Sequence, residues 1–393
     1  MSSQAFDLAR VRRDTPAAER LIHFNNAGAA LMPNTVADAV LEHFDLERRI
    51  GGYEAEAAAQ PAIEDFYDAF AQLLNCRRDE IAYVENATRA WDMAFYALPL
   101  KAGDRVLTHE SEYASNYLAL LQVAQRLGVG VDVVPSDRHG QIDVDALRRL
   151  ITVETRVIAL THVPTQNGLV NPAAAVGAVA REHGLIYVLD ACQSVGQLPL
   201  DVRRIGCHVL SGTGRKFLRG PRGTGFLYVE SSLLQMLEPP FIDMRAATAL
   251  PAAQFELRGD ARRFETWESY VAGRVGLRAA VRYLLELGVD AVSARVVALA
   301  ESLRAALRAR PGITVHDRGA ERSGIVTFTL AGEPAEVTAA RLRAGGANVS
   351  VTVAPAAPLD PHLRALKGAV RASVHYYNTE DEVASFAERV DVR

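Results

Sequence analysis

Between residues 81 and 229 the chain alternates short β-branched runs with longer amphipathic segments. The apolar runs have the length of buried strands, and the segments between them repeat their apolar positions with a helical period. The pattern predicts seven strands, at residues 81–84, 105–108, 131–134, 157–161, 185–190, 208–210 and 225–229. It predicts helices at residues 89–98, 113–127, 144–150 and 172–183, with a short one near Val202. This order is typical of an α/β fold with a mostly parallel sheet covered on both faces.

The segment before this alternation predicts two helices. Asn34 is placed to cap the first, the Gly51-Gly52 pair ends it, and Pro61 is placed to open the second. Residues 1–24 precede these helices and are predicted to form an N-terminal arm.

The segment after the alternation predicts a second unit. Residues 230–270 look irregular because prolines interrupt them. Beyond them the pattern predicts long helices at 272–287 and 291–309, strands at 325–330 and 370–374, and helices at 335–344 and 379–390. We therefore expect a large domain at residues 25–269 and a smaller C-terminal α+β domain at residues 270–393.

The composition excludes several classes of protein. The chain is 49% apolar and 23% charged with a formal net charge of −4, and its charges are interspersed, which argues against nucleic-acid binding. It holds no run of 18 apolar residues, so no membrane span is expected. No signal-peptide core follows Met1, and the three cysteines are irregularly spaced. These features predict a cytoplasmic protein without a structural metal or disulfide framework.

Lysine is scarce, because the 43 basic residues include only Lys101, Lys216 and Lys367. Lys216 stands in a Gly-rich stretch, residues 211–225, which follows an apolar run. A lysine amine can form a Schiff base with an aldehyde cofactor, whereas a guanidinium cannot. By rarity alone, a lysine left by chance is an equally good interpretation.

Asp190 closes the apolar strand predicted at residues 185–190. A carboxylate at the end of a buried strand needs a partner, and a protonated pyridine nitrogen would be one. Gln193, three residues on, could reach a phenolate oxygen of the same ring. The alternative is an aspartate that caps a following helix.

An anion site is predicted at residues 86–88, where a strand ends and a helix begins. The backbone N–H groups of Asn86, Ala87 and Thr88, with the threonine hydroxyl, could hold a phosphate. Thr213 and Arg215, beside the lysine, could contact the same group. The alternative for the first three residues is an ordinary helix cap.

Arg371 begins a late strand and is a candidate for binding a substrate carboxylate, which arginine can hold bidentately. A surface arginine is the alternative. The whole set comprises an anion site, a pyridinium partner, an aromatic for ring stacking, a Schiff-base lysine and a carboxylate-binding arginine. A pyridoxal 5′-phosphate enzyme requires this combination.

The spaced motifs of this set resemble those of a known family. The motifs are Asp190-x-x-Gln193, Thr213-Gly-Arg-Lys216, Gly220-Pro-x-Gly223 and Arg371-Ala-Ser-x-x-x-Tyr377-Asn-Thr379. They resemble the class V aminotransferase-like, or cysteine-desulfurase-like, group of fold-type I pyridoxal phosphate enzymes. The resemblance extends from about Phe24 to Val390. It implies a large domain with the seven-stranded sheet and a smaller C-terminal domain.

The resemblance implies a role for each motif residue. Lys216 would bind pyridoxal 5′-phosphate covalently, Asp190 would pair with its ring nitrogen and Gln193 with its ring oxygen. Its phosphate would be held near Asn86, Ala87, Thr88, Thr213 and Arg215. Arg371 would bind the substrate carboxylate.

Further roles depend on a second chain. Members of the family are usually homodimers with the site at the interface, so Glu268 or Ser269 would reach the partner's phosphate. Apart from any second chain, Tyr53 and Arg274 are candidates by their position for the substrate pocket. An arginine on a helix surface is an equally good interpretation of Arg274.

The sequence departs from the desulfurase pattern at three places. Desulfurases carry a sulfur-accepting cysteine on the loop before the carboxylate arginine, but residues 350–367 contain none. Cys192, inside the aspartate motif where the family usually has alanine, does not take its place, because it is interpreted as a small buried residue and not as a nucleophile. Tyr113 replaces the ring-stacking histidine, and a tyrosine with an ordinary pKa of about 10 is a poorer proton carrier at neutral pH. Arg215 replaces the histidine before the lysine.

These departures, with Val271-Ala-Gly-Arg274, resemble the branch of isopenicillin-N-epimerase-like proteins and of the sulfoxide C–S lyase of ergothioneine biosynthesis. Actinobacterial members of that branch process cysteine S-conjugates, including those of lincosamide assembly. The resemblance implies β-elimination from an S-substituted cysteine or its sulfoxide. Decarboxylating oxidative deamination, transamination and epimerisation remain alternatives. A non-catalytic cofactor-binding protein is disfavoured because Lys216, Asp190 and Arg371 are all present.

Overall fold

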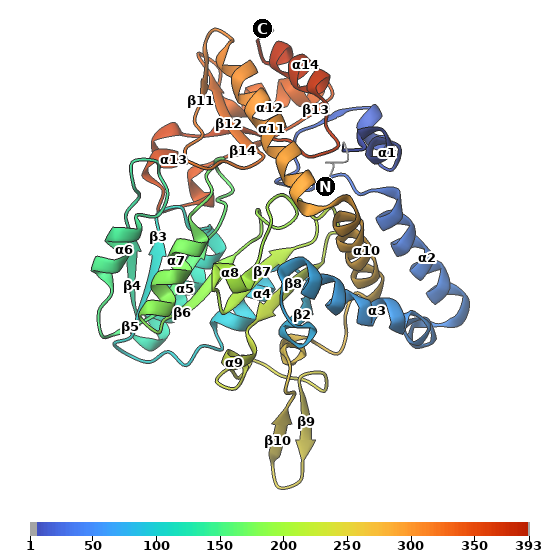
Figure 1. The fold of residues 1–393 in the computed structure, drawn as a ribbon, viewed down its shortest axis with the longest axis vertical. Coiled ribbons are helices and arrows are strands. Elements are labelled where there is room, and N and C mark those ends of the chain that lie inside the picture. Colours follow the sequence, from blue (N-terminus) through green and yellow to red (C-terminus); the bar gives the residue numbers. More distant parts are fainter. Residues whose placement is uncertain (1–5, 392–393) are drawn as a thin grey trace, which may run out of the picture.

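The computed structural model describes residues 6–391 and is built around a seven-stranded sheet (Figure 1). The first five residues of the predicted N-terminal arm lie outside the described part. The strands are β2 (Ile81–Val84), β3 (Arg105–His109), β4 (Gly130–Val134), β5 (Thr155–Thr161), β6 (Ile186–Asp190), β7 (Val209–Thr213) and β8 (Gly225–Val229). Their order is β2-β8-β7-β6-β5-β3-β4, and β8 alone runs opposite to the other six strands. The predicted α/β fold with a mostly parallel seven-stranded sheet is confirmed.

Helices cover both faces of this sheet. Those of the alternating region are α4 (Ala87–Phe95), α5 (Ala114–Leu127), α6 (Val144–Leu150), α7 (Ala173–Glu182), α8 (Val202–Ile205) and α9 (Ser231–Leu234). Alternate residues of β6 point to opposite sides, as the period of two of a strand requires. Tyr187 and Leu189 join the apolar cluster that includes α7, whereas Val188 joins the one that includes α4 and α5. Burial on both faces explains why the strands are apolar throughout.

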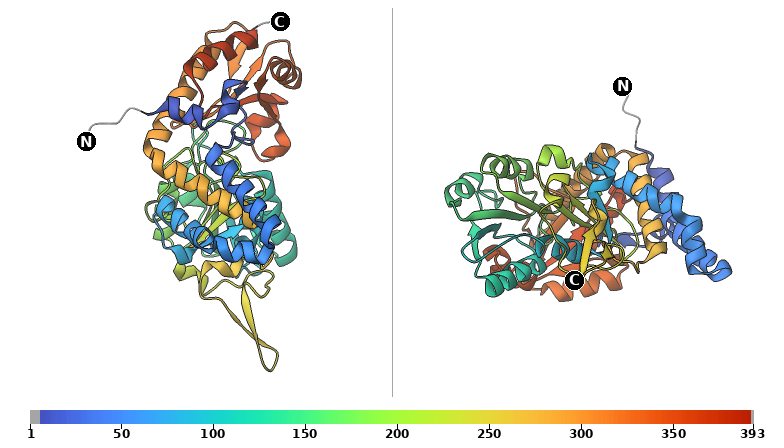
Figure 2. Two further views of the ribbon diagram at one scale, coloured as in Figure 1. Left: turned by 90° about the vertical axis from the view of Figure 1, so that its right-hand side faces the viewer. Right: turned by 90° about the horizontal axis from the view of Figure 1, so that it is seen from below.

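A second, four-stranded sheet lies near the C-terminal end of the chain, stacked on the first along the long axis (Figures 1 and 2). Its order is β11 (Ile313–Val315), β12 (Ile325–Leu330), β15 (Ala369–Ser373) and β14 (Ser350–Thr352). The accompanying helices are α10 (Val271–Leu287), α11 (Val289–Arg308), α12 (Ala335–Ala344), α13 (Pro361–Leu366) and α14 (Glu380–Asp391). The two short edge strands and α13 were missed by the sequence pattern.

The N-terminal region crosses between the two sheets. It contains α1 (Leu8–Arg13), β1 (Ile22–His23), α2 (Asn34–Ile50) and α3 (Gly52–Leu74). β1 pairs in parallel with β13 (Ala347–Asn348) of the C-terminal region. The 3₁₀ helices of the described chain are η1 (Pro16–Glu19), η2 (Arg78–Glu80), η3 (Ala261–Phe264) and η4 (Ala354–Ala356). The domain boundaries after residues 24 and 269 stay predictions.

Three local predictions are wrong. Pro61 lies inside α3 rather than at its start, because Gly51, with a φ of 99°, already separates α2 from α3. Asn34 is the first residue of α2 and not its cap, which is Pro33. The region 230–270 is not wholly irregular: β9 (Ala247–Leu250) and β10 (Gln254–Leu257) form a hairpin that projects from the body (Figure 1).

The carboxyl ends of three parallel strands meet at one edge of the large sheet. Thr161 of β5 is paired in register with Asp190 of β6, and Asp190 with Ser211 of β7. The chain leaving β7 then turns through Lys216. No helix of the described residues is long and apolar enough to cross a membrane.

Gly196 brings the loop after β6 against the loop that carries Lys216. Its φ is 92°, and a Cβ placed on it would lie 2.3 Å from the carbonyl carbon of Phe217. Two backbones therefore touch at a point where no side chain fits.

We predict that Gly196→Ala lowers the free energy of unfolding by roughly 1–3 kcal/mol more than Gly184→Ala, as overpacking costs. Gly184 also has a positive φ, but a Cβ placed on it would meet nothing within 4 Å, so it isolates backbone strain. Urea unfolding of both variants measures the difference. Equal stabilities would show that the contact with Phe217 carries no energy.

Candidate active site

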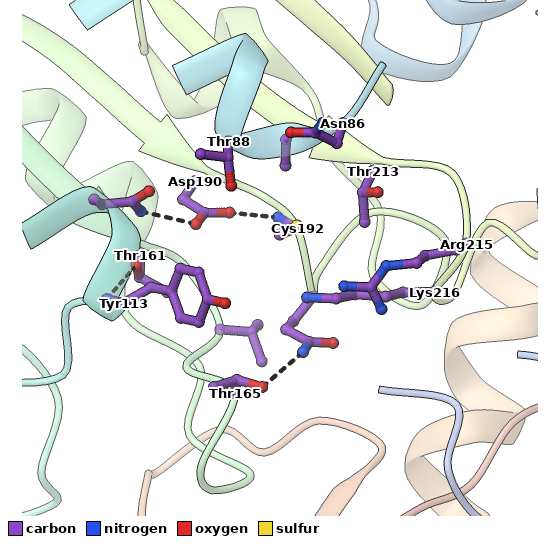
Figure 3. Close-up of a pocket in the computed structure, with 14 residues that line it drawn as sticks. Asn86, Thr88, Tyr113, Thr161, Thr165, Asp190, Cys192, Thr213, Arg215 and Lys216 are labelled. Atoms are coloured by element: carbon purple, nitrogen blue, oxygen red, sulfur yellow. Dashed lines mark hydrogen bonds between the residues drawn. The ribbon is translucent and has the colours of Figure 1, made fainter. Parts of the chain in front are cut away.

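A cavity of about 470 Å³ opens at this edge of the large sheet (Figure 3). Its lining residues are polar for the most part and come from the ends of β5, β6 and β7 and the starts of α4 and α5. They are Asn86, Ala87, Thr88, Tyr113, Asn116, Thr161, Val163, Thr165, Asp190, Cys192, Gln193, Thr213, Arg215 and Lys216. The cavity thus brings together the predicted cofactor residues except Ser269.

Lys216 is buried, with 8% of its surface exposed. Burial lowers the pKa of its amine, and the positive charge of Arg215 acts in the same direction, while Cys192 and Asp190 oppose them. A lowered pKa increases the fraction of neutral amine, which is the form that attacks an aldehyde. The side chain therefore has the environment that a Schiff-base lysine needs.

Asp190 ends β6 with its carboxylate at the cavity wall. One oxygen accepts the Cys192 backbone N–H at 2.7 Å, and the other accepts the Asn116 side-chain N–H at 2.9 Å. Burial raises the pKa of this carboxyl group. The residues that follow form turns and not a helix, so the helix-cap alternative is wrong.

The hydrogen bonds of Gln193 indicate whether the cavity suits a ring that carries a polar substituent. Its Nε2 donates to the Ala27 carbonyl at 3.1 Å and to the Thr165 hydroxyl at 3.0 Å. Its Oε1 is buried without a hydrogen-bond partner. A buried polar atom without a partner is costly, and a ring hydroxyl in the cavity would satisfy it. Together with Asp190 and Lys216, this donor set fits pyridoxal 5′-phosphate.

The part of the cavity lined by the start of α4 suits a phosphate. The Asn86 side chain caps α4 by accepting the Arg89 N–H at 2.9 Å, so the helix begins at Ala87. First-turn N–H groups have no partner within a helix and attract anions. Figure 3 shows Thr88 and Thr213 on this side, with Asn86 near them.

Tyr113 precedes α5, and its ring projects into the cavity (Figure 3). Its exposed fraction is 37%, so the ring presents a free face. The placement is compatible with the predicted stacking on a cofactor ring.

Arg371 lies beside the cavity, on β15 of the smaller sheet. It donates to the Thr165 carbonyl at 3.0 Å, to the Thr165 hydroxyl and to the Ser350 hydroxyl at 3.1 Å. Burial, with the nearby charge of Arg215, lowers its pKa to about 10. Both sheets thus contribute to the site, and Thr165 links the arginine to Gln193.

Within one chain the structure does not bring Ser269, Tyr53 or Arg274 to this cavity. They line a second cavity of about 500 Å³. Arg274 is held there by the Ser269 hydroxyl at 3.2 Å and by Glu265 at 3.9 Å. Their predicted roles therefore require a second chain and stay predictions.

Sequence reasoning missed Asn116, Thr161, Val163 and Thr165, which also line the cavity. The spacing of Asn116, three residues after Tyr113, could have indicated it because residues three apart share a helix face. Thr165 gave no signal, since it lies in a loop. Across the described residues, no group of three His, Cys, Asp or Glu side chains could hold a metal ion.

Comparison with known proteins defines the class. Residues 22–386 match the model of the aminotransferase class-V family, so the chain belongs to that family. It is 30% identical to a "probable cysteine desulfurase" of Xylella fastidiosa over 97% of this chain and 94% of the relative. It is 28% identical to another of Methanothermobacter thermautotrophicus over 97% and 96%.

The comparison of structures agrees with the family assignment. The apo structure of a cysteine desulfurase from Thermococcus onnurineus NA1 superposes with a TM-score of 0.92 at 25% identity, covering 100% of this chain and 98% of that one. The expectations of a fold-type I architecture, of pyridoxal 5′-phosphate as the cofactor and of an enzyme are confirmed.

We predict that Lys216→Ala abolishes the visible absorption band of the bound cofactor, because no other amine of the cavity can bind it covalently. Absorption spectra of the purified protein after incubation with pyridoxal 5′-phosphate test this. Lys101→Ala, at an exposed position, is the matched control and should stay yellow. A yellow Lys216→Ala protein would contradict the assignment.

Proposed function

We propose that the protein is a C–S lyase that acts by β-elimination on an S-substituted cysteine or its sulfoxide. The products are pyruvate, ammonia and a thiol, or a sulfenic acid from the sulfoxide. The observation that carries the proposal is a cofactor site without a protein thiol to receive sulfur. Residues 350–367, which precede Arg371, hold no cysteine. The cavity-lining Cys192 has its pKa raised by burial, which disfavours the nucleophilic thiolate.

The chain's own residues have separate tasks in this reaction. Pyridoxal 5′-phosphate, when bound, supplies the electron sink that makes the Cα proton of an amino acid acidic. Lys216 then removes that proton, since its pKa is lowered by burial and its amine lies in the cavity. Asp190 keeps the ring nitrogen protonated. Arg371, which Thr165 holds beside the cavity, would bind the substrate carboxylate.

The names of the relatives support a reaction at the C–S bond of a cysteine. They are called cysteine desulfurases, and desulfuration also breaks a C–S bond of cysteine. Without an acceptor cysteine before Arg371, the sulfur leaves here on its own substituent. The arginine-rich composition, with three lysines among 43 basic residues, fits an actinobacterial source and a role in thiol or natural-product metabolism.

We further propose a cytoplasmic homodimer. The cavity that holds Ser269, Tyr53 and Arg274 is lined on one side by α2 and α3 residues, including Gly52 and Glu47. Tyr53 and Trp267 expose 72% and 55% of their surfaces there. A second chain packed against this face would bury both aromatic residues and bring Ser269 towards the partner's phosphate.

We predict that cysteine S-conjugates and their sulfoxides yield pyruvate and a free sulfur product in equal amounts. Lactate-dehydrogenase coupling measures the pyruvate. Thiol titration measures the sulfur product of the S-conjugates, and mass spectrometry measures that of the sulfoxides. Cys192→Ala should keep the rate within about twofold, because the thiol takes no part. Release of carbon dioxide together with an aldehyde product would instead establish decarboxylation. A requirement for a 2-oxo acid would establish transamination. Inversion of configuration at Cα would establish epimerisation.

We predict that Arg371→Lys raises KM for the substrate at least about tenfold, the equivalent of roughly 1.4 kcal/mol, because the bidentate contact is lost. Cofactor affinity should change little. Steady-state kinetics measure KM, and a cofactor titration measures the affinity for pyridoxal 5′-phosphate. An unchanged KM would show that Arg371 does not bind the substrate carboxylate.

A further inference from the structure

Glu112 is a fully buried carboxylate outside the set of cofactor and substrate residues. It lies between β3 and α5, and four donors reach it. Its Oε1 accepts the Tyr113 backbone N–H and the Asn116 side-chain N–H, each at 2.9 Å, and the Thr161 hydroxyl. Its Oε2 accepts the Thr108 hydroxyl at 3.0 Å. Two N–H groups that can only donate face Oε1, so this oxygen carries no proton.

The Asn116 amide joins this carboxylate to the cofactor site. Its Nδ2 lies 2.9 Å from Glu112 Oε1 and 2.9 Å from Asp190 Oδ2. Both neighbours are acceptors, so the amide nitrogen must face both and each of its hydrogens has one partner. Without Glu112, the amide could rotate and present its oxygen to Asp190.

The second oxygen of Asp190 is also fixed, by the Cys192 N–H. Two donors therefore define the plane of this carboxylate, and one of them is itself held by Glu112. Burial raises the pKa of Glu112, and the Asp190 charge acts in the same direction, so the two acids influence each other inside the fold.

We propose that Glu112 is a positioning residue for Asp190: it orients the Asn116 amide, and that amide aims the Asp190 carboxylate at the ring nitrogen of pyridoxal 5′-phosphate. Thr108 and Thr161 anchor Glu112 at the ends of β3 and β5. This inference rests on the cofactor and is independent of the proposed lyase reaction.

The test measures binding of the cofactor to apoprotein and needs no substrate. The dissociation constants of pyridoxal 5′-phosphate and of its analogue with carbon in place of the ring nitrogen are compared. Glu112→Ala, which removes the acceptor of the Asn116 N–H, and Asn116→Ala should each weaken pyridoxal 5′-phosphate binding about tenfold and change binding of the analogue less than twofold, since the analogue has no ring nitrogen for Asp190 to hold.

The double variant Glu112→Ala/Asn116→Ala should bind no more weakly than Asn116→Ala, because the glutamate acts through the asparagine. Glu110→Gln is the matched control: Glu110 belongs to the same loop but accepts the Ser136 hydroxyl away from the cavity, and it should leave both constants unchanged.

Equal loss for the two ligands would overturn the proposal and show a general structural role, as would unchanged binding or additive effects in the double variant. If Glu112→Ala fails to fold, Asn116→Ala tests the proposal by the same comparison of the two ligands. Wild-type apoprotein that binds neither ligand would refute the cofactor assignment itself, whereas failure of the lyase assay leaves these measurements unaffected.

Discussion

The burial of Asp190 at the end of an apolar strand is the constraint on which the site depends. A carboxylate there is tolerated only if N–H groups and a cationic ligand compensate for its lost hydration. β6 lies between β5 and β7, so the adjacent strand ends supply Thr161 on one side and the turn to Lys216 on the other. α5 adds the Asn116 amide. The same edge of the sheet therefore stabilises the charge and assembles the residues that use it.

The sequence predicted the seven strands well because each is buried on both faces and so reads as a continuous apolar run. It indicated Lys216 because lysine is scarce and this one stands in a Gly-rich stretch, and Asp190 because it closes an apolar strand, with Gln193 three residues on. The phosphate side followed from a helix that begins directly after a strand, and Arg371 from its place at the start of a late strand. Edge strands such as β11 and β14, of three residues each, were missed because so short a run has no period. Pro61 was misjudged because a proline in the first half of a long helix reads like a helix start.

Other parts of the site could not come from the sequence because they depend on tertiary contacts. Thr165 is a loop residue that joins Gln193 to Arg371, and only the stacking of the two sheets places those side chains together. Glu112 is an acidic residue in a charged-looking segment, yet it is completely buried. Tyr53 and Arg274 lie in a separate cavity of the chain, so their predicted substrate role stays a prediction.

The pairing of β1 with β13 has a consequence for the way the protein is made on the ribosome. The large sheet is complete once β8 has emerged, but the segment after β1 must wait for the last strands. Asn26 donates to the Ser373 carbonyl at 2.7 Å, and the adjacent Ala27 carbonyl accepts from Gln193. This early segment, which holds the Gln193 side chain, therefore reaches its final place only after the strand that carries Ser373 has been synthesised.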